Sequence, residues 1–162
     1  MNDAHLHLVV NHFPIIGTIF GLGILITGLF LKNNSVKNTA YMLLVVAAVC
    51  AALSMGTGEG AEEMVEDMPT IGKQIIHEHE EWAEKFALVL YVTGMMSLIA
   101  FFLNFKKNSL EKFAAIATVV LALIAVVLAK EVGTSGGEIR HTEIRDNGLQ
   151  PVGGESHEEE ND

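Results

Sequence analysis

Histidines are the residues of this sequence best suited to bind a haem or a metal. His12 stands at the start of one long apolar run, and His79 stands shortly before another. Neutral imidazole is a common axial ligand of haem iron and a frequent ligand of other transition metals. The remaining histidines are His5, His7, His77, His141 and His157. The chemistry therefore depends on which elements position His12 and His79.

Four apolar runs without charged side chains predict four transmembrane helices, over residues 13–31, 39–55, 86–105 and 113–129. Each run approaches the ~20 residues that a helix needs to cross the hydrocarbon core. Strands are excluded, because their backbone groups would go unpaired in lipid. We expect an all-α integral membrane four-helix bundle over residues 1–145, followed by a flexible acidic tail over 146–162. The first run lacks a positive segment before it and is expected to stay in the mature protein.

Lysines predict how the bundle is oriented. The short connections after the first and third runs carry Lys32, Lys37, Lys106, Lys107 and Lys112, against the single acid Glu111. Short basic loops face the cytoplasm. Both termini and the connection 56–85 are therefore expected on the periplasmic side of a bacterial inner membrane. The second half of that connection, 71–85, is expected to begin the third helix.

Short loops also predict that the first and third helices run in the same direction and lie diagonally in the bundle. His12 and His79 should then lie at similar heights and could hold haem b between them as an axial pair. An interfacial histidine that bonds a carbonyl or a headgroup is the alternative. Helical spacing predicts two inward stripes, one with His5, His12, Ile16, Ile19 and Gly23, the other with His79, Ala83, Phe86, Leu90 and Ser97.

The other histidines are candidates for a second centre or for supporting contacts. Helical residues two apart point in nearly opposite directions, so one member of each pair, His5/His7 and His77/His79, should have a different role. A supporting hydrogen bond is one such role. A zinc, copper or iron site is the alternative to haem, with His5, His7, His77, Glu59, Glu63 and Glu81 as its ligands.

Glycines predict three further features. Gly17 and Gly21 predict close helix packing, and Gly136-Gly137 predicts a tight turn that folds the next residues over the bundle mouth. There Arg140 or Arg145 could pair with haem propionates, and His141 could be a ligand; an exposed polar turn is the alternative. Asp3 is a candidate N-cap for an outward extension of the first helix. Cys50 is expected to be a small buried hydrophobe.

The charge of the chain limits the kinds of partner that it is expected to bind. A formal net charge of −10 argues against nucleic acid, because phosphates require a basic surface. The acidic periplasmic side is expected to be solubilising, or else a docking surface for a basic periplasmic cytochrome. Other respiratory-complex subunits or a second copy of the chain are further candidate partners. The absence of charges within the apolar runs disfavours an ion-coupled transporter.

Four motifs occur in order along the chain: His12-Phe13-Pro14-Ile15, Thr57-Gly58, His79-x-x-x-Ala83 and Gly136-Gly137-x-Ile139. Together they resemble an uncharacterised bacterial family of four-span membrane proteins with an HFPI opening and a closing GG motif, over most of residues 5–145. The resemblance implies a four-helix inner-membrane fold and haem binding. The chain departs from the family near His141, where an aromatic residue is commoner, so the resemblance assigns no role to His141.

These features favour a cytochrome-like electron-transfer protein or complex subunit over a stand-alone enzyme. Electrons would pass between a periplasmic donor and a membrane partner through haem b. No Cys-x-x-Cys-His is present, so covalent haem attachment is not expected. A non-catalytic structural subunit and a non-haem metal protein are the alternatives. We find no clear internal repeat in the sequence.

Overall fold

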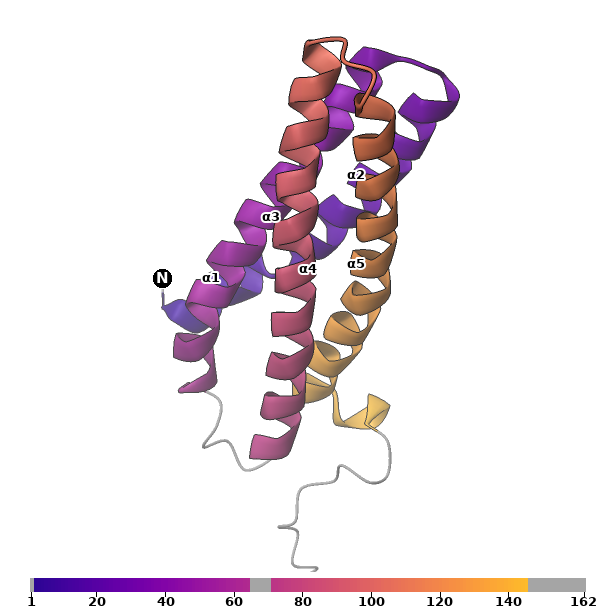
Figure 1. Ribbon diagram of the computed structural model, residues 1–162. Helices are drawn as coiled ribbons and strands as arrows, with labels where there is room; N and C mark the ends of the chain where they lie inside the picture. Colours follow the sequence, from indigo (N-terminus) through magenta and orange to yellow (C-terminus); the bar gives the residue numbers. More distant parts are fainter. Residues whose placement is uncertain (1, 65–70, 146–162) are drawn as a thin grey trace, which may run out of the picture.

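The computed structural model describes residues 2–64 and 71–145, and these residues are helical with no strand (Figure 1). The elements are α1 (Asp3–Val10), α2 (His12–Phe30), α3 (Asn34–Glu62), α4 (Lys73–Phe105), α5 (Glu111–Arg140) and the 3₁₀ helix η1 (Thr142–Ile144). The predicted flexible tail 146–162, with His157, lies outside the described residues.

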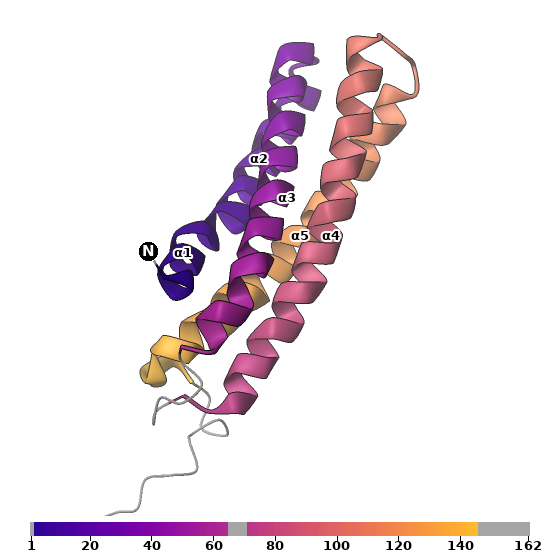
Figure 2. The ribbon, with the colours of Figure 1, turned by 90° about the vertical axis from the view of Figure 1, so that its left-hand side faces the viewer.

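The four long helices form two antiparallel hairpins, α2–α3 and α4–α5, which lie side by side (Figure 2). Helix α3 packs against α4, α2 packs against α5, and the short α1 packs on α3. Helices α2 and α4 are therefore diagonal, as expected. We call the end with the two short connections the turn end, at the top of Figure 1, and the opposite end the histidine end.

Four segments are long and apolar enough to cross a membrane: Ala4–Phe30, Asn34–Glu62, Lys73–Phe105 and Glu111–Arg140. Large apolar side chains point away from the bundle; Phe30 is 83% exposed and Phe113 is 72% exposed. Such a surface suits hydrocarbon rather than water. The all-α, four-span prediction is confirmed, and the chain is suited to be a multi-pass membrane protein.

The helices extend beyond the predicted spans at the histidine end. Helix α4 begins at Lys73, which confirms the expected early start of the third helix. The glycine-rich stretch 56–62, expected to be a connection, instead continues α3 to Glu62. Glycine weakens a helix by only about 1 kcal/mol. Contacts with α1 along this part of α3 offset that preference.

The first span is kinked at Asn11, which lies between α1 and α2 and keeps helical φ and ψ values of −65° and −22°. Pro14 lacks the N–H that would bond to Val10, and its ring crowds that residue's carbonyl, so a continuous helix is disfavoured. The predicted N-cap was wrong by one residue. Asn2, rather than Asp3, caps α1, since its side chain accepts a hydrogen bond from the His5 backbone N–H at 3.0 Å.

Small residues allow the helices to approach closely. A Cβ atom at Gly17 would lie 2.9 Å from the Ala47 Cβ, and one at Gly21 would lie 2.7 Å from the Leu44 Cδ2. The predicted packing through Gly17 and Gly21 is therefore present. Hydroxyl groups inside the bundle donate to carbonyls four residues earlier, as Thr18 does to Pro14 at 2.6 Å. Buried Thr93, Ser97 and Thr118 do the same.

Both turns have the same backbone geometry. Lys32 and Lys107 adopt positive φ values of 51° and 53° after α2 and α4. The N–H of the following asparagine donates to a carbonyl five residues back, Asn33 to Gly28 and Asn108 to Leu103. These are Schellman helix ends. The side chain of each asparagine then accepts from the backbone N–H two residues ahead, which starts the next helix.

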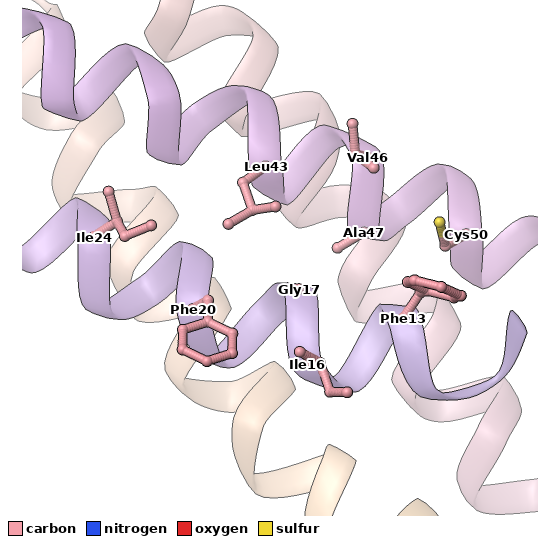
Figure 3. A pocket seen from close by; sticks show the side chains of 9 residues that line it. All are labelled: Phe13, Ile16, Gly17, Phe20, Ile24, Leu43, Val46, Ala47 and Cys50. Atoms are coloured by element: carbon pink, nitrogen blue, oxygen red, sulfur yellow. The ribbon is translucent and has the colours of Figure 1, made fainter.

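A groove between α2 and α3 is lined only by apolar side chains and Cys50 (Figure 3). Phe13, Ile16 and Phe20 come from α2, and Leu43 and Val46 come from α3. Cys50 is partly buried and free, in keeping with its expected role as a small apolar residue. The groove offers no imidazole and no carboxylate, so it is not the candidate site.

Candidate histidine site

His7 is held on α3 by two hydrogen-bonding groups. Its Nδ1 lies 3.1 Å from the backbone oxygen of Ser54 and 3.2 Å from the Thr57 Oγ1. The ring is half-buried. A Cβ atom at Gly58 would lie 3.9 Å from the His7 Cε1, so the ring rests against this helix turn. The imidazole of His7, which belongs to α1, thus packs against the end of α3.

His79 is held on α5 in the same way. Its Nδ1 lies 3.1 Å from the Ser135 Oγ, and the ring also hydrogen-bonds the Val132 backbone. A Cβ atom at Gly136 would lie only 3.0 Å from the His79 Cε1, so the ring lies close to this glycine and would have to shift for a larger residue. His79 lies within electrostatic range of His7. The two half-buried imidazoles at the histidine end are therefore the candidate site.

The hydrogen bonds fix which nitrogen carries the proton. A carbonyl oxygen only accepts, so the His7 Nδ1–H must be the donor to Ser54. The Ser135 hydroxyl donates its proton to the Glu131 carbonyl at 2.9 Å, which leaves its lone pair to accept from the His79 Nδ1–H. In the Nδ1–H form of a neutral imidazole, Nε2 keeps its lone pair. The described residues offer no hydrogen-bond partner to either Nε2.

The two halves of the site repeat one arrangement. In both, an imidazole interacts with a backbone group and with a hydroxyl three residues later, and its ring lies near the glycine that follows the hydroxyl. These residues are Ser54, Thr57 and Gly58 for His7, and Val132, Ser135 and Gly136 for His79. In each hairpin the histidine and its hydroxyl partner lie the same number of residues from the turn, so the two side chains come level with each other. His7 and Thr57 each lie 25 residues from Lys32, and His79 and Ser135 each lie 28 residues from Lys107.

His12 does not meet His79 in this structure. It is exposed at the start of α2, and the stripe predicted to face inward with it is exposed as well, with Ile16 at 48% and Ile19 at 50%. That orientation was wrong because α2 packs through Thr18 and Gly21, which turns the whole stripe from His5 to Gly23 outward. The stripe below His79 does face inward: Phe86, Leu90 and Ser97 are buried, and Ala83 is partly buried.

The other predicted ligands stay on the surface. In each histidine pair one member is exposed: His5, and His77, whose ring lies 3.4 Å from Glu81. Glu59 and Glu63 are exposed at the end of α3. Within residues 2–64 and 71–145, no three His, Cys, Asp or Glu side chains are placed so that they could hold a metal ion. The alternative set of His5, His7, His77, Glu59, Glu63 and Glu81 is therefore not assembled there.

The turn predicted at Gly136-Gly137 was wrong, because both glycines lie inside α5. They are needed for packing instead, since a Cβ atom at Gly137 would lie 3.2 Å from the Ile144 Cδ1. The chain turns after Arg140. Arg145 then donates from Nε to the Glu138 carbonyl at 2.6 Å and from Nη2 to the Ile139 carbonyl at 3.1 Å, which caps α5.

Arg140 and His141 are exposed beside this cap. The His141 Nδ1 lies 3.0 Å from a Glu143 carboxylate oxygen. The pKa of the Glu143 carboxyl lies below its usual range, because its own backbone N–H and the His141 ring hydrogen-bond it. His141 is thus paired locally rather than gathered with His7 and His79.

Comparisons with protein-family models, curated proteins and solved structures found no match to this chain. The site is therefore described by its own geometry. Sequence reasoning missed Ser54, Thr57 and Ser135 as imidazole partners. The equal sequence distances of each histidine and its hydroxyl partner from Lys32 or Lys107 were the signal that could have identified Thr57 and Ser135.

Proposed function

We propose that the protein is a membrane-bound haem b protein for electron transfer, with His7 and His79 as the axial ligands. The observation that carries the proposal is the pair of neighbouring imidazoles whose Nδ1 atoms are tied to the protein and whose Nε2 lone pairs are left for a ligand. Metal-bound histidines commonly have this arrangement, because the Nδ1 hydrogen bond fixes the ring and raises its basicity.

The donor set fits haem b. Two neutral imidazoles suffice, because the porphyrin supplies the other four nitrogen ligands. Gly136 lets the His79 ring lie close to the backbone of α5, and Gly58 lies beside the His7 ring on α3. Bound haem supplies one-electron chemistry, and the surrounding hydrogen bonds adjust the potential at which it operates. Exposed Arg140 is a candidate partner for a propionate.

Orientation and partners are part of the proposal. The lysines of the two turns support a cytoplasmic turn end, which puts the histidine end and both termini in the periplasm of a bacterial inner membrane. The site then lies where a soluble periplasmic cytochrome could reach it, and where a membrane partner could pass electrons on. The resemblance to the HFPI family supports the same assignment.

The test is a reduced-minus-oxidised absorbance spectrum of the detergent-purified protein from haem-replete cells, with a pyridine haemochrome assay on the same sample. We expect a b-type spectrum. His7→Ala and His79→Ala should lose it, because each removes one axial ligand. His12→Ala and His77→Ala are matched controls on the same two spans; both histidines are exposed, and both variants should keep full absorbance.

Two outcomes would overturn the proposal. A flat spectrum in the wild-type protein would favour a structural subunit, or a non-haem metal protein if zinc, copper or iron copurified in stoichiometric amount. A b-type spectrum that survived His7→Ala and vanished in His12→Ala would keep the haem but return the ligand role to the pair His12 and His79.

A further inference from the structure

The repeated surroundings of the two imidazoles carry an inference about residues that do not themselves touch a ligand. Thr57 Oγ1 donates to the Leu53 and Ser54 carbonyls at 3.1 and 3.0 Å. Ser135 Oγ donates to the Glu131 carbonyl at 2.9 Å and lies 3.4 Å from the Val132 carbonyl. Each hydroxyl is thus oriented by its own helix before it meets an imidazole.

This orientation decides the direction of the next hydrogen bond. A hydroxyl has one proton, and a helix carbonyl already holds it. The oxygen can then only accept from the ring, so it stabilises the Nδ1–H tautomer together with the backbone carbonyl beside it. In both halves of the site a hydroxyl accepts that ring proton, which His7 shares with the Ser54 carbonyl, and both Nε2 atoms are left unprotonated.

We propose that Thr57 and Ser135 are equivalent positioning residues, which set the tautomer and orientation of His7 and His79 so that the two Nε2 lone pairs serve one ligand. The ligand class that this arrangement fits is a metal centre with two like axial positions, such as an iron porphyrin. The identity of the ligand rests on the proposed function. The role of the two hydroxyls in setting the tautomers does not.

The first experiment uses the haem-free protein. Long-range proton–nitrogen spectra of the full chain, labelled with ¹⁵N-histidine in detergent, report the tautomer of each ring. We expect His7 and His79 to be Nδ1–H in the wild type. Thr57→Val should raise the Nε2–H population of His7, and Ser135→Ala should raise that of His79. Thr57→Ser and Ser135→Thr keep the hydroxyl and should restore the wild-type spectrum.

The second experiment uses the haem-loaded protein. An Nδ1–H bond to an acceptor makes the imidazole a stronger donor and favours the oxidised metal. Thr57→Val and Ser135→Ala should therefore each raise the midpoint potential, and each should weaken haem binding by about 10-fold or more. Thr134→Val is the control, because Thr134 is exposed next to Ser135.

The outcomes separate the two proposals. Tautomers and potentials that match the wild type in both hydroxyl-free variants would overturn the positioning role, even in a haem-loaded protein. A change in only one variant would overturn the equivalence of the two halves. A wild type that binds no haem, yet shows the expected tautomers and their loss, would overturn the proposed function and leave the positioning role supported.

Discussion

The Lys37 Nζ lies 2.7 Å from the Glu111 Oε1, and this ion pair joins α3 to α5 across the diagonal of the bundle. Both side chains are 9% exposed. The Tyr41 hydroxyl donates to the same carboxylate oxygen at 2.9 Å. Glu111 also begins α5, where the positive end of the helix dipole favours a carboxylate. The pair closes the turn end, opposite the histidine site.

Breaking the ion pair should destabilise the bundle. Lys37→Met or Glu111→Leu alone leaves the other charge buried and unpaired, which costs about 3–5 kcal/mol. The double variant should recover most of that loss, because no charge remains without a partner. Unfolding followed by circular dichroism in detergent measures the effect, with Lys112→Met as the exposed control. Equal stability in the single variants and the wild type would contradict it.

Glycine positions in α2 should respond oppositely to alanine. A Cβ atom at Gly28 would lie 2.8 Å from the Lys37 backbone nitrogen, whereas one at Gly23 meets nothing within 4 Å. Gly28→Ala should destabilise by about 1–3 kcal/mol, because α2 and α3 must separate. Gly23→Ala should stabilise by about 0.5–1 kcal/mol through helix propensity. The same unfolding assay compares them, and a Gly28→Ala variant as stable as Gly23→Ala would count against this helix packing.

The seat of His79 should be sensitive to a single methyl group. Gly136→Ala pushes against the His79 Cε1 at 3.0 Å, so the ring must shift. We expect haem affinity to fall by about 10-fold, the lower end of the range for residues that support a metal ligand. Haem titration followed by absorbance measures it. Gly133→Ala is the matched control on the same helix, since a Cβ atom there meets nothing within 4 Å. Equal haem affinities in the Gly136→Ala and Gly133→Ala variants would contradict a role for Gly136 in positioning His79.

The orientation in the membrane can be tested with single cysteines. In a Cys50→Ala background, Glu63→Cys places a thiol at the histidine end and Ser109→Cys places one at the turn end, both on exposed positions. A membrane-impermeant maleimide should label Glu63→Cys in spheroplasts, and Ser109→Cys only after the membrane is opened. The reverse pattern would put the histidine end in the cytoplasm and remove the periplasmic donor from the proposal.

Hydropathy was sufficient to predict the four spans and their antiparallel order, because each apolar run is long and uncharged. It could not predict which face of α2 packs, since nearly every residue from Phe13 to Leu31 is apolar. Small residues decide that face: Thr18, Gly21 and Gly28 are buried while Ile16 and Ile19 face outward. The outward position of His12 follows from this choice.

His79 could be placed from its sequence because α4 is continuous from Lys73 to Phe105, so its register with Phe86 and Leu90 holds. His7 could not, because the helix changes direction at the kink at Asn11, between His7 and α2. Its position depends on a carbonyl of Ser54, 47 residues away. A backbone carbonyl acceptor cannot be recognised from composition or periodicity. Only the equal sequence distances of His7 and Thr57 from Lys32 indicate where it lies.

The kink at Asn11 lets the outer end of the first span lean toward α3 at its own angle. Helix α1 carries His7, belongs to the span Ala4–Phe30, and packs on α3. A small change in the tilt of these eight residues would move His7 relative to His79 while α2 keeps its packing. The spacing of the two imidazoles is thus set by the tilt of one short helix rather than by the packing of the bundle.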